Sequence, residues 1–377
     1  MQAGLITFFA ASFFLLFGCS QQVTREEPPV DPLEQWDTDI SIRSVPLREF
    51  KAILPRDVIP PIDDPVYWNV EQASGTYFEH EPVMAIDING DVRAYPLSVL
   101  MYHEIVNDVV GNVPVSVTYC PLCNAAIVFD RRLEFNDEEY LLNYGTSGML
   151  RKSDLVMWDR QTETWWQQLT GEALVGELTG ATLTMIPSVL ISFNEFIRNY
   201  PDGQVLSTDT GYDREYGKNV YVGYDDPNNR PDFFDGRIDE RLPAMERVIN
   251  ITVDGNHRVY PLTVIKKEKV INDSPFGKPI VIFHQSGTVS VMDDEMIQNS
   301  RDVGAVGVFD PHINGQRLTF QKTEQGFIDN ETNTVWTIAG KAIEGELQGK
   351  QLSWIFHGNH FAFAWLAFYP NTEIYGQ

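Results

Sequence analysis

The sequence predicts a β-rich α+β protein built from two tandem, related β units. Two observations carry this prediction. Short runs rich in β-branched and aromatic residues alternate with Gly, Pro and Asn-Gly turn signals along most of the chain. In addition, Val83–Leu97 recurs as Val248–Leu262, an offset of 165 residues (258 − 93) that keeps Gly, Arg and Tyr-Pro-Leu in place. We therefore expect an internal duplication.

Later motifs return in the same order and set the expected boundaries. Asn107 and Asp108 match Asn272 and Asp273 at the same offset, and the Asp-x-x-Thr-x-Thr-x-Trp motif beginning at Asp159 returns at Asp329. These matches predict a first unit over residues 40–208 and a second, cysteine-free unit over 243–377. Between them, 209–242 is rich in Asp, Asn, Gly and Pro, which is typical of a long linker loop.

Within the first unit the local patterns predict individual elements. Alternation broken by Asn-Gly predicts a hairpin, and a Pro before an apolar run predicts a helix that starts there. The expected elements are a hairpin at 86–93, helices at 96–103 and 193–199, and strands at 113–119, 125–130, 164–168 and 183–186.

The N-terminus resembles a bacterial lipoprotein signal. Leu5–Phe17 is too short to span a bilayer as a helix and is followed by Gly18 and Cys19, so residues 1–18 read as a signal peptide and Cys19 as the lipidated residue. Phe17 is bulkier than usual there, and an ordinary cleaved signal or an uncleaved anchor is the alternative. Residues 19–39 read as a tether. Ser20 favours the outer membrane, facing the periplasm.

The formal charge of −25 excludes some partners. Nucleic acids and anionic membrane surfaces both select Lys and Arg, so we expect neither to bind directly. The expected contact with the membrane is the lipid on Cys19, in a bacterial cell-envelope protein.

Cys120 and Cys123 are the candidate reactive residues, because Cys19, the third cysteine of the chain, is expected to carry the lipid. Two thiols at CxxC spacing often form a redox pair, in which Cys120 attacks and Cys123 resolves. His103 would hold or exchange a proton, and an envelope redox partner is implied. A standing structural disulfide is an alternative in an oxidising compartment.

A metal site is the other alternative. Two thiolates suit copper(I) or zinc, and a closed zinc site needs four ligands. His103, His357 and His360 are the histidines that could complete such a site between the units. Alternatively, His103 hydrogen-bonds within the core and the other two lie on a loop.

The repeat limits where this chemistry can occur. At the 165-residue offset, Cys120 falls on Gln285, Cys123 on Thr288 and His103 on Glu268. The second unit keeps the scaffold motifs without any thiol, so cysteine chemistry belongs to the first unit alone.

Several motifs together resemble the domain of unknown function 3179 family. They are Tyr95-Pro-Leu, His103-Glu-x-Val-Asn-Asp, Tyr119-Cys-Pro-Leu-Cys-Asn, Ser153-Asp-Leu-Val-Met-x-Asp-Arg and Gln168-Leu-Thr-Gly. The resemblance runs from about Ile40 to the C-terminus. The family has no established reaction, but some relatives are described as selenoproteins, which implies redox use of the cysteine region.

Two further clusters favour structural roles. The linker acids Asp225, Asp226, Asp232, Asp235 and Asp239 could attract calcium but lack EF-hand spacing, so a solvated loop is the preferred interpretation. Trp158, Trp165 and Trp166 could line a sugar cleft, although aromatic residues beside strand-like threonines more often form a core.

Overall fold

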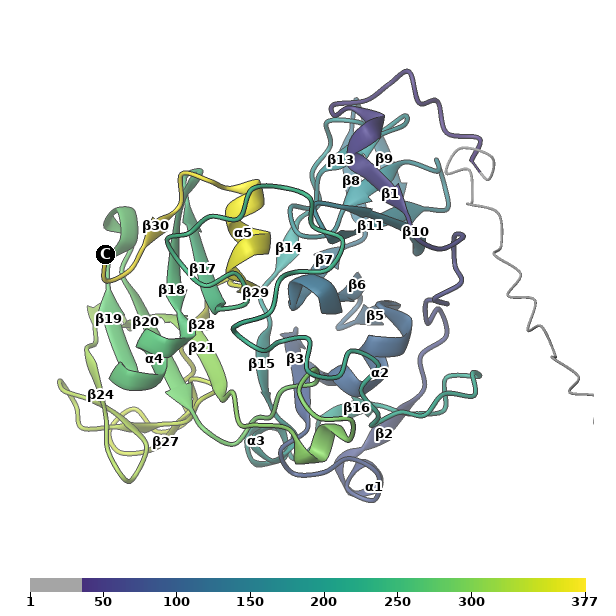
Figure 1. Cartoon of the computed structure of the whole chain (residues 1–377). Helices are drawn as coiled ribbons and strands as arrows, with labels where there is room; N and C mark the ends of the chain where they lie inside the picture. Colours follow the sequence, from purple (N-terminus) through teal and green to yellow (C-terminus); the bar gives the residue numbers. More distant parts are fainter. Residues whose placement is uncertain (1–35) are drawn as a thin grey trace, which may run out of the picture.

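The computed structural model describes residues 36–377 and shows the β-rich α+β class predicted from the sequence (Figure 1). The signal peptide, Cys19 and all but the last residues of the tether lie outside the described residues. Within 36–377, no helix is long and apolar enough to cross a membrane. The lipid anchor therefore stays a prediction.

Two sheets and a hairpin belong to the first half alone. One sheet has the order Met185–Ile186 (β14), Ala125–Asp130 (β7), Val113–Cys120 (β6) and Ile105–Val110 (β5). The other has the order Phe50–Ala52 (β1), Tyr144–Arg151 (β10), Asp154–Asp159 (β11), Trp165–Gln167 (β12) and Ala173–Val175 (β13). Arg132–Phe135 (β8) and Glu138–Leu141 (β9) form the hairpin.

The largest sheet runs through both halves. Its order is Val270–Asp273 (β19), Ile280–Gln285 (β20), Ala305–Asp310 (β21), Val189–Ser192 (β15), Pro82–Ile88 (β3), Asp91–Pro96 (β4), Gln204–Leu206 (β16) and Tyr67–Asn69 (β2), with Ser353–Trp354 (β28) beside β21. The halves meet where β15 pairs antiparallel with β21. One buried apolar cluster also draws residues from both halves. The two halves therefore share a sheet and a core.

The second half adds its own smaller sheets. One has the order Asn359–Phe361 (β29), Arg247–Val253 (β17), Asn256–Pro261 (β18) and Glu373–Ile374 (β30). Another has the order Phe320–Lys322 (β24), Phe327–Asp329 (β25), Val335–Trp336 (β26) and Ala342–Glu344 (β27), and His312–Ile313 (β22) pairs with Gln316–Arg317 (β23). The α-helices are Val70–Ala73 (α1), Leu97–His103 (α2), Phe193–Asn199 (α3), Leu262–Glu268 (α4) and Ala362–Phe368 (α5).

The local predictions for the first unit match these elements. The Asn-Gly signal lies at the turn between β3 and β4, where Asn89 and Gly90 have φ angles of 54° and 83°. Such a turn suits the right-handed twist of paired strands and needs residues that tolerate positive φ. The helix expected at 96–103 is α2, with Pro96 as its N-cap, and the helix at 193–199 is α3. Residues 209–242 contain no helix or strand.

The two halves also contain equivalent elements and equivalent hydrogen bonds. The segments β3-β4-α2 and β17-β18-α4 begin and end 165 residues apart (247 − 82 and 268 − 103). Tyr95 Oη donates to Asp108 at 2.5 Å, and Tyr260 Oη donates to Asp273 at 2.7 Å. These correspondences are what a duplication would produce, and the duplication itself stays a prediction.

Candidate functional site

The candidate site forms where two hairpins end in tight turns. Cys120 is the last residue of β6 and pairs with Ala125, the first residue of β7, so Pro121–Cys123 forms a single 3₁₀ turn between the strands. Asn124 ends this turn with a φ of 51°. Asp154 begins β11 directly after the β10–β11 turn.

These turns bring three potential ligands together. The sulfur atoms of Cys120 and Cys123 and a carboxylate oxygen of Asp154 all lie within 4.8 Å of one another, and all three residues are buried. Both cysteines are free thiols, and Cys123 Sγ donates to the carbonyl oxygen of Ser153 at 3.3 Å. Among residues 36–377, no other group of three or more His, Cys, Asp or Glu side chains comes this close together.

Asp154 is a buried acid with one carboxylate oxygen that accepts no hydrogen bond. Its Oδ2 accepts hydrogen bonds from Gln167 Nε2 at 2.6 Å and from the Leu169 amide at 3.0 Å. Its Oδ1 is buried and has no hydrogen-bond partner among the described residues. Burial raises the pKa of Asp154 to about 6, although these hydrogen bonds and the two thiols lower it in part.

The surroundings disfavour the thiolate form of both cysteines. Burial raises the pKa of the Cys120 thiol, and the nearby charges of Asp154 and Glu104 raise it further. Burial also raises the pKa of Cys123 well above its usual range, as do Cys120 and Asp154. Without a cation, both thiols are therefore protonated at neutral pH.

Glu104 is a second acid beside this group. It follows α2 with a left-handed φ of 58°, and burial followed by the charge of Asp154 raises its pKa to about 8. Its counterpart in the second half, Lys269, has a φ of 65°. The left-handed turn therefore recurs in both halves, whereas the acid occurs only in the first. Within 36–377, no Lys, Arg or His side chain forms an ion pair with Glu104 or Asp154.

The sequence did not single out Asp154 or Glu104. Both stand in motifs that carry the family resemblance, directly after Ser153 and His103. Asp154 lies 34 residues after Cys120 (154 − 120), and spacing alone does not show that β11 and the β6–β7 turn meet. Their place in those motifs was the available signal.

The structure does not bring the histidines into this group. His103 uses both ring nitrogens elsewhere, Nδ1 with the carbonyl of Pro60 at 2.7 Å and Nε2 with Tyr216 Oη at 2.6 Å. His357 Nδ1 faces the carbonyl of Ile355 at 2.9 Å. His360 belongs to β29 and stacks on Trp365 with ring centroids 5.3 Å apart. None of the three is a ligand in the arrangement described.

The linker covers the site. Three of its acids, Asp226, Asp232 and Asp235, are exposed as predicted for a solvated loop, but Asp225 is not. Asp225 is 1% exposed and forms ion pairs of 2.8 Å with both Arg247 and Arg301. Close to the cysteines, Tyr224 Oη donates to the carbonyl of Leu122 at 3.1 Å. In addition, Ser153 Oγ donates to the carbonyl of Asp232 at 2.6 Å.

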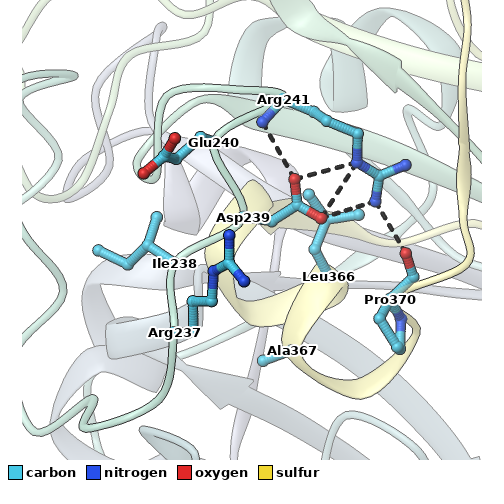
Figure 2. Close-up of a pocket in the computed structure, with 8 residues that line it drawn as sticks. All are labelled: Arg237, Ile238, Asp239, Glu240, Arg241, Leu366, Ala367 and Pro370. Atoms are coloured by element: carbon cyan, nitrogen blue, oxygen red, sulfur yellow. Dashed lines mark hydrogen bonds and ion pairs between the residues drawn. The ribbon is translucent and has the colours of Figure 1, made fainter.

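A surface pocket of about 660 Å³ lies apart from the cysteines, between the linker and the end of α5 (Figure 2). Figure 2 shows that Asp239 faces Arg241, whose guanidinium donates to Asp239 at 2.7 Å and to the Pro370 carbonyl at 2.8 Å. Neither Cys nor His lines this pocket. Because Asp239 and Arg241 pair with each other and no Cys or His lines it, this pocket is a weaker candidate than the cysteine site.

The tryptophans form a core. Trp158, Trp165 and Trp166 are at most 7% exposed, and Trp36 packs edge-on against Trp158 and Trp165. Side chains this buried do not line an open sugar cleft.

Glu104 should make the stability of the metal-free protein depend on pH. Its folded pKa of about 8 lies above its ordinary value of 4.5, so the folded state holds a proton that the unfolded chain releases in between. Stability should therefore fall as pH rises from 5 to 8. Glu104→Gln removes this contribution. Between pH 5 and pH 8, the free energy of unfolding of the variant should therefore rise by about 3 kcal/mol relative to that of wild type.

Urea unfolding of both chains at pH 5 and pH 8, with metal removed, measures this difference. Exposed Glu139→Gln is the control and should follow wild type at both pH values. An equal pH dependence in Glu104→Gln and wild type would show that Glu104 is not buried as described.

Comparison with known protein families places the chain in one of them. The model for the family described as "Protein of unknown function (DUF3179)" matches residues 56–372. The chain belongs to the DUF3179 family. The match takes in both halves of the DUF3179 protein and includes Glu104, Cys120, Cys123 and Asp154. No curated protein and no solved structure matches the chain.

Proposed function

We propose that this DUF3179 protein binds a zinc ion through Cys120, Cys123 and Asp154. The observation that carries the proposal is the buried group itself, three ligand atoms within 4.8 Å of one another. Among residues 36–377, Asp154 Oδ1 lacks a hydrogen-bond partner, and no Lys, Arg or His forms an ion pair with Asp154 or Glu104. Buried acids without a counter-charge are unfavourable, and a bound divalent cation supplies that charge.

The donor atoms favour zinc over copper(I). Copper(I) prefers sulfur ligands, whereas zinc accepts both thiolate sulfur and carboxylate oxygen. Zinc takes four ligands, and a water molecule can fill the position that these three residues leave open. The raised pKa values of the thiols fit this proposal, because a metal ion deprotonates the cysteines that bind it.

Metal analysis of the full chain, purified under reducing conditions, tests the proposal. We expect stoichiometric zinc in the wild type and a loss of most of it in Cys120→Ser and Cys123→Ser. Cys19→Ser carries the same change at the third cysteine and should keep the metal. Metal-free wild-type protein, or a Cys120→Ser chain that retains zinc, would contradict the proposal.

A thiol redox centre is the second candidate, favoured by one observation. The two sulfur atoms lie within 4.8 Å of each other, and the buried Asp154 carboxyl beside them has a pKa of about 6, which suits a proton acceptor. Cys120 would attack a substrate disulfide and release one thiol. Cys123 would then displace the second thiol, leaving a Cys120–Cys123 disulfide. The raised pKa values of both thiols rank this candidate below zinc.

Reaction with glutathione disulfide separates the two candidates. A redox centre predicts that metal-free protein reacts faster than free cysteine at pH 7, with most of the rate lost in Asp154→Asn. A zinc site predicts a rate no faster than free cysteine and no requirement for Asp154.

We also propose, from the sequence around Cys19, that the protein is lipid-anchored in the bacterial cell envelope. Full-length protein expressed in a Gram-negative host should partition into detergent. Cys19→Ser should move to the aqueous phase. Equal partitioning of wild type and Cys19→Ser would contradict this proposal.

A further inference from the structure

We propose that a pocket beside Cys120 binds a small, uncharged, mainly apolar molecule. That this molecule acts as a ligand of the cysteine site rests on the proposed function, whereas its binding to the pocket does not. The pocket has a volume of about 100 Å³. For comparison, a cavity of about 150 Å³ accommodates benzene.

Five segments distant in sequence form the walls. The loop between β1 and β2 contributes Ile59, the β10–β11 hairpin contributes Leu150 and Leu155, and the linker contributes Tyr221 and Phe233. The end of α2 and the β6–β7 turn complete the lining. Because these segments come together only in the folded chain, the pocket is a tertiary feature.

The pocket adjoins the cysteine site directly. Leu122, which lies between the two cysteines in sequence, lines it, and so does Leu155, whose backbone amide is close enough to lower the pKa of the Cys120 thiol in part. Glu104 also lines it, and its charge acts on the Cys120 thiol. Cys120 itself is only 2% exposed. A molecule in the pocket therefore lies against the groups that surround Cys120, where a bulky protein partner has no direct access.

The lining favours a neutral ligand. Most of the lining side chains are aliphatic or aromatic, and none is Lys, Arg or His. An anion would lie beside Glu104 and Asp154 without a counter-charge. A cation would lose its hydration among apolar walls with only one acid, Glu104, in the lining. A neutral molecule with one polar atom avoids both penalties.

The mouth of the pocket is unusually apolar. Ile53 and Phe233 line the pocket and are 39% and 47% exposed. Grouped exposed apolar side chains mark binding sites on soluble proteins. This rim suits the apolar body of a ligand whose tip enters the pocket.

Binding of isobutanol, isobutyrate and isobutylamine tests the inference, because the three share a branched carbon skeleton and differ in charge. Saturation-transfer NMR with the full chain should show isobutanol binding at least 10-fold more tightly than either charged molecule. Isobutyrate or isobutylamine binding equally well would overturn the neutral class.

A matched pair of variants locates the binding. Ile59→Trp fills the pocket and should weaken isobutanol binding at least 10-fold, whereas Ile343→Trp adds the same indole at an exposed position of β27 and should leave it unchanged. Unaltered binding in Ile59→Trp would overturn the inference. Isobutanol binding to a protein that lacks zinc would uphold the pocket and refute the zinc site. A protein that holds zinc but does not bind isobutanol would uphold the zinc site and refute the pocket.

Discussion

Zinc affinity is expected to fall by about 100-fold for each pH unit below pH 8, because binding displaces one proton from each of two thiols. Both thiols have raised pKa values, so both are protonated throughout this range. Protons compete with zinc for the same sulfur atoms, so acid weakens binding and alkali strengthens it. Competition with a chromophoric chelator at several pH values measures the slope.

Asp154 adds a third proton at lower pH. Because its pKa is about 6, the dependence should steepen towards about 1000-fold per pH unit below that value. In Asp154→Asn, affinity should be weaker at pH 8 and the slope should stay near two protons at every pH. An affinity that is constant between pH 6 and 8 would rule out thiolate ligation.

Asp225→Ala is expected to lower the free energy of unfolding by about 4 kcal/mol, since it removes one partner of a buried ion pair. The Asp225 side chain is fully buried and pairs with Arg247, whose side chain is only 8% exposed. Ser290 Oγ also donates to Asp225 at 2.6 Å. The substitution leaves the Arg247 charge buried without its carboxylate. Urea unfolding measures the loss.

The same substitution should disturb the cysteine site. Arg247 also donates to Asn124 Oδ1 at 2.8 Å, next to the Cys120–Cys123 turn. With the linker loosened, the thiols of metal-free Asp225→Ala should react faster than wild type with a thiol reagent under native conditions. Asp226→Ala, at the exposed neighbouring position, should change stability by less than about 1 kcal/mol and leave the thiols slow. Equal losses in both variants would show that the ion pair does not hold the linker.

Sequence reasoning was strongest where structure is decided locally. The hairpin at Asn89 and Gly90, the helices α2 and α3, and the strands on either side of the cysteine turn follow from turn chemistry, helix capping and β-rich runs. Each of these signals acts within a few residues, so spacing in the sequence reports it directly. The placement of Cys120 and Cys123 at a tight turn between two strands was predictable for the same reason.

The sequence by itself determined the β-rich class, the repeated motifs and the pair of thiols. Only the tertiary structure decided what surrounds that pair: Asp154 from β11, Glu104 from the end of α2, and a linker fixed through Asp225. It also placed His103 against Pro60 and Tyr216 instead of the sulfur atoms. The physical reason is that local patterns specify which strands and turns form. Which turns then meet depends on packing between sheets, where burial and unpaired charge give Cys120 and Cys123 their chemistry.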